Sequence, residues 1–278
     1  MIIRQMQPKD CFAARRLWQA VFHDTEGFAN FYFSHRFTPV LSFGAFDDGE
    51  LVSMSLGRRF RMANPSYHAV MISGVSTMPE YRHRGLMRET MTRLLENARL
   101  RGYDIAVLTP AIPHLYDPFR FAPLTYAVEV TETASDLPED IMVCMGAENL
   151  YPIYQKAEKA HRCMMHRTKE DVELALNEYR RDHGITLITK DRNGYICFLP
   201  QVDGVEVTEC LAVNAEDYQR LMKAAAFHSE TQSATAWLPQ DCGLPGTTVR
   251  PLYAVSLKEQ IRLESLSNDP KSYCIEKY

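Results

Sequence analysis

The segment from Tyr67 to Leu108 constrains the fold of this chain more than any other. Its first part, Tyr67–Val75, has the apolar content of a strand, and residues 86–100 place apolar side chains on one face of a helix. That face consists of Leu86, Met87, Thr90, Met91, Leu94, Leu95 and Ala98. Gly102 stands where a glycine often ends a helix, and Asp104–Leu108 is typical of a short, buried parallel strand. The segment therefore predicts a β-turn-α-β unit.

Neighbouring patterns extend this unit. Helical spacing over Phe12–Phe22 is followed by strands over Leu41–Phe46 and Leu51–Leu56, with the hairpin turn Asp47-Asp48-Gly49 between them. The second half repeats the order of helices, hairpin, long strand, helix and strand, which predicts an internal duplication. This second set comprises helices over 150–160, 169–181 and 216–227, strands over 185–189, 195–199, 205–213 and 234–238, and turns at Arg192-Asn193-Gly194 and Asp203-Gly204.

A length of 278 residues favours two domains, since domains usually hold roughly 100–200 residues. Between Thr131 and Asp140 the periodicity is lost and turn-forming residues gather, as in a linker. We therefore expect an α/β protein with mixed sheets and two tandem domains. The expected divisions are a first domain over 1–135, a second over 141–240 and a carboxy-terminal extension over 241–278.

Composition excludes several classes of protein. The net charge of −4 gives no overall attraction to nucleic acid, although a local basic patch stays compatible with it. The start of the chain lacks a signal peptide pattern, and no apolar run is long enough for a membrane span. Seven scattered cysteines without a Cys-x-x-Cys pair are typical of reduced thiols. We expect a cytoplasmic protein that binds no metal, nucleic acid or membrane.

The turn before the long helix has the residues that a phosphate group requires. A pyrophosphate at the amino end of this helix would meet unpaired backbone N–H groups and the positive end of the helix dipole. Gly85 permits close approach of the backbone, and Arg82, Arg84 and Arg88 add cations suited to phosphate oxygens. The equivalent turn of the second half, Asn214-Ala215-Glu216-Asp217, has neither glycine nor cation, so we expect no phosphate loop there.

This turn resembles the acyl-CoA motif of the GNAT acetyltransferase superfamily, Arg/Gln-x-x-Gly-x-Gly/Ala, at Arg82, Gly85 and Met87. Met87 departs from the usual Gly/Ala. In this respect the turn resembles that of the enhanced intracellular survival (Eis-like) branch, which tolerates a large apolar residue there. The segment His114-Leu115-Tyr116-Asp117-Pro118-Phe119-Arg120-Phe121 also resembles that branch. The branch carries a third, sterol-carrier-like domain, which we do not expect here because few residues follow the strand-like Val249–Leu257.

The resemblance implies roles for particular residues. It implies that Tyr116 is the general acid and that acetyl-CoA is the cosubstrate. The implied acyl-CoA contacts are Val75, Thr77, Arg82, His83, Arg84, Gly85, Leu86, Met87 and Arg88. In the branch the terminal carboxylate enters the site, but without the third domain this role does not pass simply to Tyr278. The base that deprotonates the acceptor therefore stays open among His114, Asp117 and the carboxylate of Tyr278.

The leading hypothesis is thus an N-acetyltransferase acting on a primary amine of a small molecule or peptide, with an acceptor pocket formed by helices near Phe28–His35 and by the second domain. The alternative is a non-catalytic module that binds acyl-CoA and contacts a partner. A dinucleotide-binding fold is disfavoured because Gly-x-Gly-x-x-Gly is absent. The sequence leaves the identity of the acceptor and the oligomeric state open, homo-oligomers included.

Overall fold

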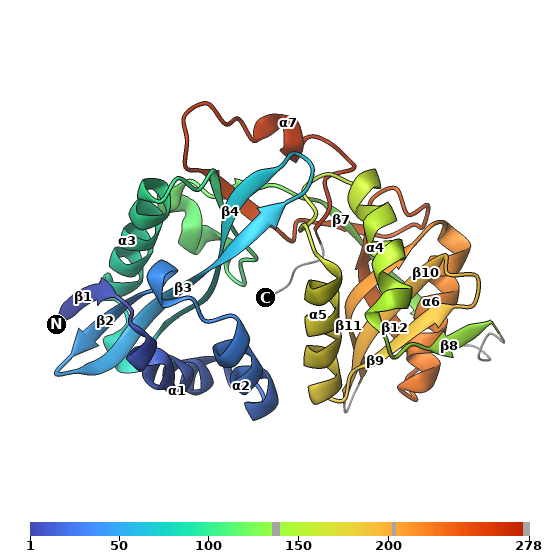
Figure 1. The fold of residues 1–278 in the computed structure, drawn as a ribbon, viewed down its shortest axis with the longest axis horizontal. Helices are drawn as coiled ribbons and strands as arrows, with labels where there is room; N and C mark the ends of the chain where they lie inside the picture. Colours follow the sequence, from blue (N-terminus) through green and yellow to red (C-terminus); the bar gives the residue numbers. More distant parts are fainter. Residues whose placement is uncertain (135–139, 202–203, 275–278) are drawn as a thin grey trace.

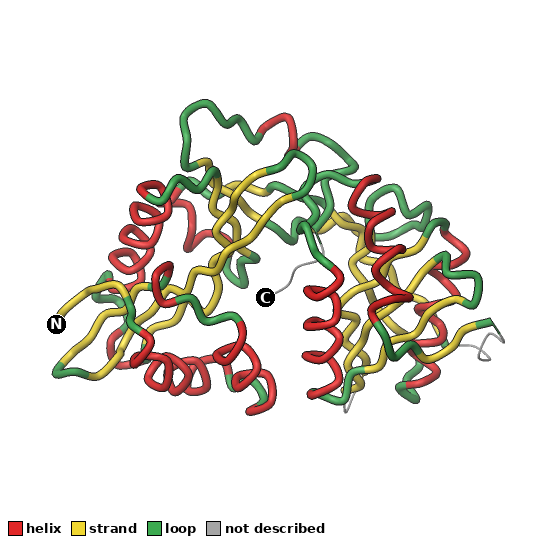
Figure 2. Tube along the Cα trace, viewed as in Figure 1, coloured by secondary structure: helices red, strands yellow, loops and turns green. Residues whose placement is uncertain are grey.

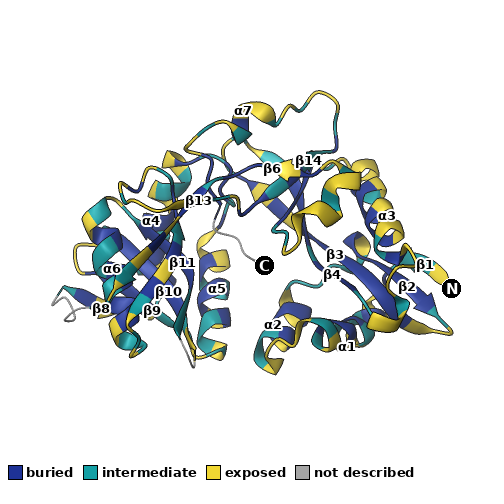
Figure 3. Cartoon of the chain, turned by 180° about the vertical axis from the view of Figure 1, so that it is seen from behind, coloured by how far each residue is buried: buried dark blue, intermediate teal, exposed yellow. Residues whose placement is uncertain are grey.

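The computed structural model describes residues 1–134, 140–201 and 204–274. They form two domains, each a seven-stranded mixed sheet flanked by helices, which confirms the predicted α/β class and the tandem arrangement (Figures 1 and 2). The two domains lie side by side, and α2 of the first contacts α5 of the second (Figures 1 and 3). None of the helices in the described ranges is long and apolar enough to cross a membrane.

The first domain contains the predicted β-turn-α-β unit. Its strands and helices are β1 (Ile2–Gln5), α1 (Cys11–Phe22), α2 (Glu26–His35), β2 (Phe43–Asp47), β3 (Glu50–Met62), β4 (Tyr67–Thr77), α3 (Leu86–Leu100), β5 (Ile105–Leu108), β6 (Ala122–Pro123) and β14 (Tyr253–Ser256). They are supplemented by the 3-10 helices η1 (Pro8–Asp10), η2 (Pro39–Leu41), η3 (Pro79–Tyr81) and η4 (Pro113–Phe119). The sheet order is β1-β2-β3-β4-β5-β14-β6, with β4 and β5 parallel.

The second domain repeats this plan. Its elements are β7 (Ala127–Thr133), β8 (Ile141–Val143), α4 (Ala147–Ala160), α5 (Lys169–Arg181), β9 (Ile185–Thr189), β10 (Gly194–Gln201), β11 (Gly204–Ala212), α6 (Ala215–His228), β12 (Ser233–Leu238) and β13 (Thr247–Val249). Written from β8, the sheet order is β8-β9-β10-β11-β12-β7-β13, and β11 and β12 are its parallel pair. The same order in both sheets fits the predicted duplication. The short helix α7 (Glu264–Ser267) follows the last strand.

The two domains exchange one strand each. β7 follows β6 in the chain but pairs with β12 and β13 of the second sheet, whereas β14 returns from the second domain to pair with β5 and β6. The sheets therefore divide the chain differently from the expected boundaries at 135 and 241. The single strand expected over 249–257 is in fact β13 and β14, which lie in different sheets. Asp203 of the expected turn at Asp203-Gly204 and the centre of the expected linker, 135–139, fall outside the described residues, whereas Gly204 is the first residue of β11.

Helices cover both faces of the first sheet. α3 packs Met91, Leu94 and Leu95 against Val70 and Ile72 of β4 in one buried cluster. On the opposite face, Trp18 of α1 and Tyr32 of α2 pack in a second buried cluster with side chains of β3. Apolar area removed from water stabilises a fold by about 25 cal/mol per Å². The two buried clusters therefore hold the helices against the sheet, and the loop after β4 joins elements that are fixed in this way.

Strand β4 contains a bulge at Gly74. Ser76 pairs with Met54 and Ser73 with Leu56, so two residues of β4 lie opposite the single residue Ser55. Gly74 has a φ of +56°, in the left-handed region that glycine reaches without steric cost. An ideal Cβ there would lie 2.5 Å from Cζ3 of Trp18, so the bulge also depends on the close approach of α1.

We expect Gly74→Ala to destabilise the protein by about 3 kcal/mol, the sum of left-handed strain and overlap with the indole ring. Urea unfolding of both proteins measures the difference. Gly49→Ala is the matched control, because Gly49 has a φ of +86° but no atom within 4 Å of an added Cβ. Its expected cost is the strain alone, about 1 kcal/mol. Equal losses for the two variants would contradict the role of the indole contact.

Candidate active site

The parallel strands β4 and β5 separate at their carboxyl ends. Their pairing runs from Ala69↔Ile105 to Met71↔Val107, while β4 continues to Thr77. Between Ile72 and Thr77, the edge of β4 that faces β5 therefore has no strand partner within the described residues. The side chain of Thr77 is held by the hydroxyl of Ser53 at 2.8 Å, which fixes this end of β4 to β3. The separation leaves backbone N–H and C=O groups available to an extended ligand.

The turn between β4 and α3 has an open amino-terminal end. Gly85 is the N-cap residue of α3, has a φ of +76° and places no side chain on the N–H groups of the first helical turn. An added Cβ at Gly85 would meet no atom within 4 Å. The left-handed φ explains why glycine stands here, and the free space lets a ligand reach the backbone directly. These features fit a pyrophosphate group.

The basic side chains of the turn lie exposed around this end of α3. Arg82 donates from Nε to the carbonyl oxygen of Thr77 at 3.3 Å, which ties the turn to the end of β4. Arg84 donates to the carbonyl oxygen of Glu80 at 2.9 Å and stacks over the ring of Tyr81. His83 and Arg88 are also exposed. The turn thus presents positive charge to solvent beside the uncapped N–H groups.

Met87 and Leu86 point toward the core instead. Leu86 is buried against β2 and β3, and the half-buried Met87 packs on the cluster beneath α3. The sequence position at which most members of the superfamily have Gly or Ala thus has an apolar side chain that contributes to packing. Because the Met87 side chain points toward the core, it leaves the backbone of the turn exposed.

Tyr116 lies on η4, after β5. Its ring packs on the same cluster as Val75 and Met87, and it meets Phe121 edge-on with centroids 6.0 Å apart. Burial raises the pKa of Tyr116. Within the described residues its hydroxyl has no hydrogen-bond partner, so that hydroxyl is available to a ligand. The structure therefore brings together Tyr116, the bulged part of β4 and the start of α3, which are separate in the sequence.

The corresponding turn of the second domain is closed. Asn214 caps α6 by accepting from the backbone N–H of Asp217 at 2.9 Å. Glu216 and Asp217 place negative charge in the first turn of this helix. A phosphate group would meet an occupied N–H and two carboxylates there, which agrees with the expectation that this half lacks a phosphate loop.

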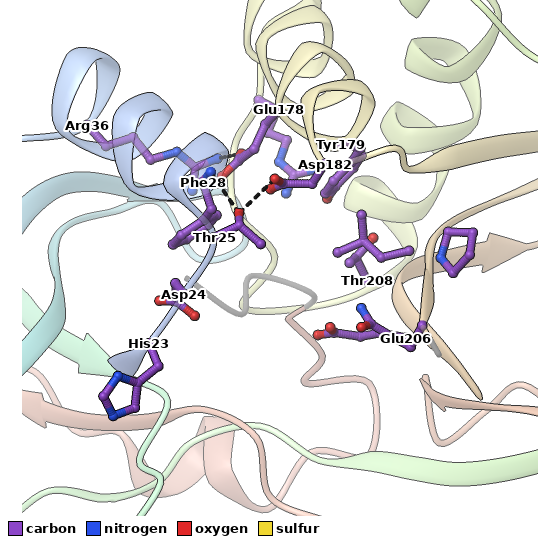
Figure 4. Close-up of a pocket in the computed structure, with 14 residues that line it drawn as sticks. His23, Asp24, Thr25, Phe28, Arg36, Glu178, Tyr179, Asp182, Glu206 and Thr208 are labelled. Carbon is purple, nitrogen blue, oxygen red and sulfur yellow. Dashed lines mark hydrogen bonds and ion pairs between the residues drawn. The ribbon is translucent and has the colours of Figure 1, made fainter. Parts of the chain in front are cut away.

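A pocket of about 400 Å³ lies between the two domains (Figure 4). One wall is the α1–α2 loop and α2, and the other is α5 with strands β10 and β11. The charged side chains that line it are Asp24, Arg36, Arg167, Glu178, Asp182 and Glu206. Four of these six are acidic, so the pocket favours positively charged ligands.

Two contacts between α2 and α5 close one side of this pocket. Arg36 forms an ion pair with Glu178, and both side chains are largely buried. Thr25 caps α2 and donates its hydroxyl hydrogen to Asp182 at 2.8 Å (Figure 4). Because each contact joins residues about 140 to 160 positions apart, they fix the position of one domain against the other.

The acidic character of the pocket affects Asp24. The surrounding protein disfavours its charged form and raises the pKa of Asp24, although the indole N–H of Trp18, 2.6 Å away, opposes the shift. The negative charges of Asp182 and Glu206 raise this pKa further. The three carboxylates thus act on one another across the pocket, and a cation between them would relieve the repulsion.

The pocket is connected to β4 through α2. Phe28 lines the pocket. One turn later, the hydroxyl groups of Tyr32 and Ser73 form a hydrogen bond of 2.6 Å. Ser73 precedes the bulge at Gly74. The expectation that residues near Phe28–His35 and the second domain form a pocket agrees with this arrangement, but sequence reasoning did not find Asp24, Asp182 or Glu206. Their signal was weak, because isolated acidic residues are usual on surfaces.

The structure selects none of the three candidate bases. His114 and Asp117 are both exposed on η4, close in sequence to Tyr116. Tyr278 lies outside the described residues. Within the described ranges, no three His, Cys, Asp or Glu side chains gather as metal ligands do.

Comparisons with known proteins agree with this geometry. The profile of the acetyltransferase (GNAT) domain matches residues 2–124. None of the curated proteins matches the sequence.

Several solved structures share the fold. A probable N-acyltransferase from Enterococcus faecalis has a TM-score of 0.70 at 18% identity, covering 92% of this chain and 72% of that one. Eis1 from Mycobacterium abscessus has a TM-score of 0.65 at 16% identity, with 92% and 74% covered. A putative acetyltransferase from Pyrococcus horikoshii has 0.62 at 18% identity, with 95% and 92% covered. Residues 2–124, which hold the open turn and Tyr116, therefore match the acetyltransferase (GNAT) domain, and the solved structures share the fold of the chain.

Proposed function

We propose that the protein is an acetyl-CoA-dependent N-acetyltransferase that acts on a primary amine. One observation carries the proposal: Tyr116, Val75 at the open edge of β4 and Met87 next to the uncapped Gly85 turn all pack against one core cluster. The turn and the open edge can hold a phosphate-bearing thioester, and the hydroxyl of Tyr116 can supply a proton where its sulfur departs.

The residues fit acetyl-CoA in three places. The N–H groups after Gly85, with Arg82, Arg84 and Arg88, would bind the pyrophosphate, and His83, Leu86 and Met87 shape the same turn. The unpaired edge of β4 near Val75 and Thr77 would bind the extended pantetheine arm by backbone hydrogen bonds. An N–H near Val75 would stabilise the negative charge that develops on the thioester oxygen.

Tyr116 would act as the general acid. The amine nitrogen attacks the acetyl carbon, a C–N bond forms, the C–S bond breaks, and the hydroxyl of Tyr116 donates its proton to the departing sulfur. A thiol has a pKa near 8.5, below the raised pKa of Tyr116, so the donor is fully protonated at neutral pH. The ammonium ion loses one proton before the attack and the nitrogen loses a second one after it, each to solvent or to His114 or Asp117, the two described candidate bases, and the Tyr116 phenolate regains a proton from solvent.

The acceptor would enter through the acidic pocket between the domains. A primary amine with a pKa of about 10.4 is almost entirely an ammonium ion at neutral pH. Asp24, Asp182 and Glu206 would attract that cation, and α2 leads from the pocket to Ser73 at the bulged strand. An acceptor with a second positive charge gains most from this pocket.

Release of free thiol from acetyl-CoA, measured over a panel of mono-amines, diamines and amino-terminal peptides, tests the proposal. We expect amine-dependent thiol release and an acetylated product detected by mass spectrometry. The alternative, a non-catalytic acyl-CoA sensor, predicts a higher melting temperature with acetyl-CoA but no turnover with any amine. Thermal stabilisation without product would therefore overturn the enzymatic proposal.

The acidic pocket yields a separate prediction. Replacing Asp182 and Glu206 by their amides, Asp182→Asn with Glu206→Gln, should raise KM for a diamine about tenfold and leave kcat nearly unchanged, because about 1.4 kcal/mol of charge attraction is lost. Steady-state kinetics at two salt concentrations measure it. Glu216→Gln, on the exposed start of α6, is the control. An unchanged KM would exclude this pocket as the acceptor site.

A further inference from the structure

A second groove gathers basic side chains beside the carboxyl end of α3, at the far end of this helix from the acyl-CoA turn. It has a volume of about 610 Å³. Its lining includes Arg59, Arg61, His68, Arg101 and His166. These residues come from β3, β4, the end of α3 and the segment before α5. No part of the proposed acetyl transfer uses them.

The sheet register brings these side chains to one face. On β3, Phe60 and Met62 are buried in one core cluster, so Arg59 and Arg61 project to the opposite side. Arg61 is paired with His68 of β4, and antiparallel partners share a face of the sheet. α3 covers this face only over Val70 and Ile72, and it ends before reaching the arginines. The groove is therefore the uncovered continuation of the face that α3 packs on.

The positive charge in the groove exceeds the negative charge of the residues that line it. Within the described part of the chain, Arg59 and Arg61 have no carboxylate partner, and Arg101 donates from Nε to the neutral amide of Asn97 at 2.9 Å. The single acid in the lining is Asp171, whose carboxylate accepts from the backbone N–H of Thr168 at 2.8 Å as part of the cap of α5.

The groove contrasts with the chain as a whole. The net charge of the protein is −4, whereas the lining of the groove contains three arginines and one acid. Two lining residues have acidic neighbours outside the groove: His166 lies 3.2 Å from Glu158, and the backbone N–H of His68 donates to Asp104 at 2.8 Å. Guanidinium groups that line one groove repel one another, and a bound anion would attract each of them.

We propose that this groove is a binding site for a small phosphate-bearing molecule, separate from the acyl-CoA turn. Guanidinium groups match the geometry of phosphate oxygens in pairs, which favours phosphate over a monocarboxylate. The volume lies within the roughly 300–1,000 Å³ of small-molecule sites. Tyr103, half-buried in the wall, offers a ring beside the cations that a nucleoside could contact. A compact hollow suits a small molecule better than an extended nucleic acid, which needs a basic stripe.

Isothermal titration calorimetry tests the site with two probes, inorganic pyrophosphate and ATP, in the presence of saturating acetyl-CoA. We expect both probes to bind with the acyl-CoA turn filled, and the double variant Arg59→Ala/Arg61→Ala to weaken each of them at least about tenfold. Tighter binding of ATP than of pyrophosphate assigns a nucleotide to the groove, and equal binding assigns the phosphate group alone. Repeating the titration on Arg82→Ala makes the result independent of whether acetyl-CoA binds the turn.

Arg93→Ala is the matched control, since Arg93 is exposed on α3 and does not line the groove. It should leave both affinities unchanged. Equal weakening by Arg93→Ala and by the double variant would show general charge attraction and overturn the site. Loss of pyrophosphate binding on addition of acetyl-CoA would place the anion in the turn and also overturn it. Tighter binding of a DNA duplex than of ATP, dependent on the same arginines, would replace the proposal with a nucleic-acid surface.

Discussion

Tyr116→Phe is expected to lower kcat for acetyl transfer by about 10²-fold or more, because a positioned general acid contributes about 10² to 10⁴ to the rate. The substitution removes only the hydroxyl, and the ring keeps its contact with Phe121 and with the core beneath α3. The affinity for acetyl-CoA and the melting temperature should therefore remain those of the wild type. Steady-state rates at saturating acetyl-CoA measure the loss.

The pH dependence sharpens this test. The acid must be protonated, so the contribution of Tyr116 is present below its pKa and is lost as pH rises through it. Burial raises the pKa of Tyr116 above its ordinary value of about 10, so between pH 6 and pH 9 this group should cause no fall in kcat. Tyr67→Phe, at the opposite end of β4, is the control. Unchanged turnover of Tyr116→Phe over this range would remove Tyr116 from the chemistry.

Gly85→Ala is expected to weaken acetyl-CoA binding by about 10- to 100-fold, since an added methyl group would hold the pyrophosphate away from the backbone N–H groups. Losing a hydrogen bond to a charged group costs about 1.5–3 kcal/mol, which corresponds to that range. The fold itself has room for the methyl group, so the loss of stability should be only the left-handed strain, about 1 kcal/mol. Calorimetric titration with acetyl-CoA and urea unfolding measure the two effects.

Gly49→Ala is the control that separates the effect of backbone strain from the effect of keeping acetyl-CoA away from the backbone. Gly49 also has a left-handed φ and open surroundings, but it lies in the β2–β3 hairpin. Its substitution should reproduce the loss of stability and leave acetyl-CoA affinity unchanged. If Gly85→Ala bound acetyl-CoA as tightly as Gly49→Ala, the pyrophosphate would not lie against this turn.

The open turn before α3 was predictable because its parts are local. The periodicity over 86–100 matches α3 from its first residue to its last, and glycine before it marks an open helix start. The absence of an open turn before α6 was likewise predictable, since Asn214 and Asp217, which form the cap of this helix, are three residues apart in the chain. The position of Tyr116 could be given only by resemblance, because Tyr116, Val75 and Met87 come from three separate elements that pack against one cluster.

The sequence by itself determined the helices, the hairpins, the open turn at Gly85 and the repeated order of elements, because each depends on side chains within a few residues of one another. Only the tertiary structure decided the exchange of β7 and β14, since a short apolar strand carries no signal that selects one sheet edge over another. It also decided the acidic pocket and the basic groove. Asp24 meets Asp182, and Arg61 meets His166, only after distant segments have packed, and charge at a surface has no periodicity that could reveal such a meeting.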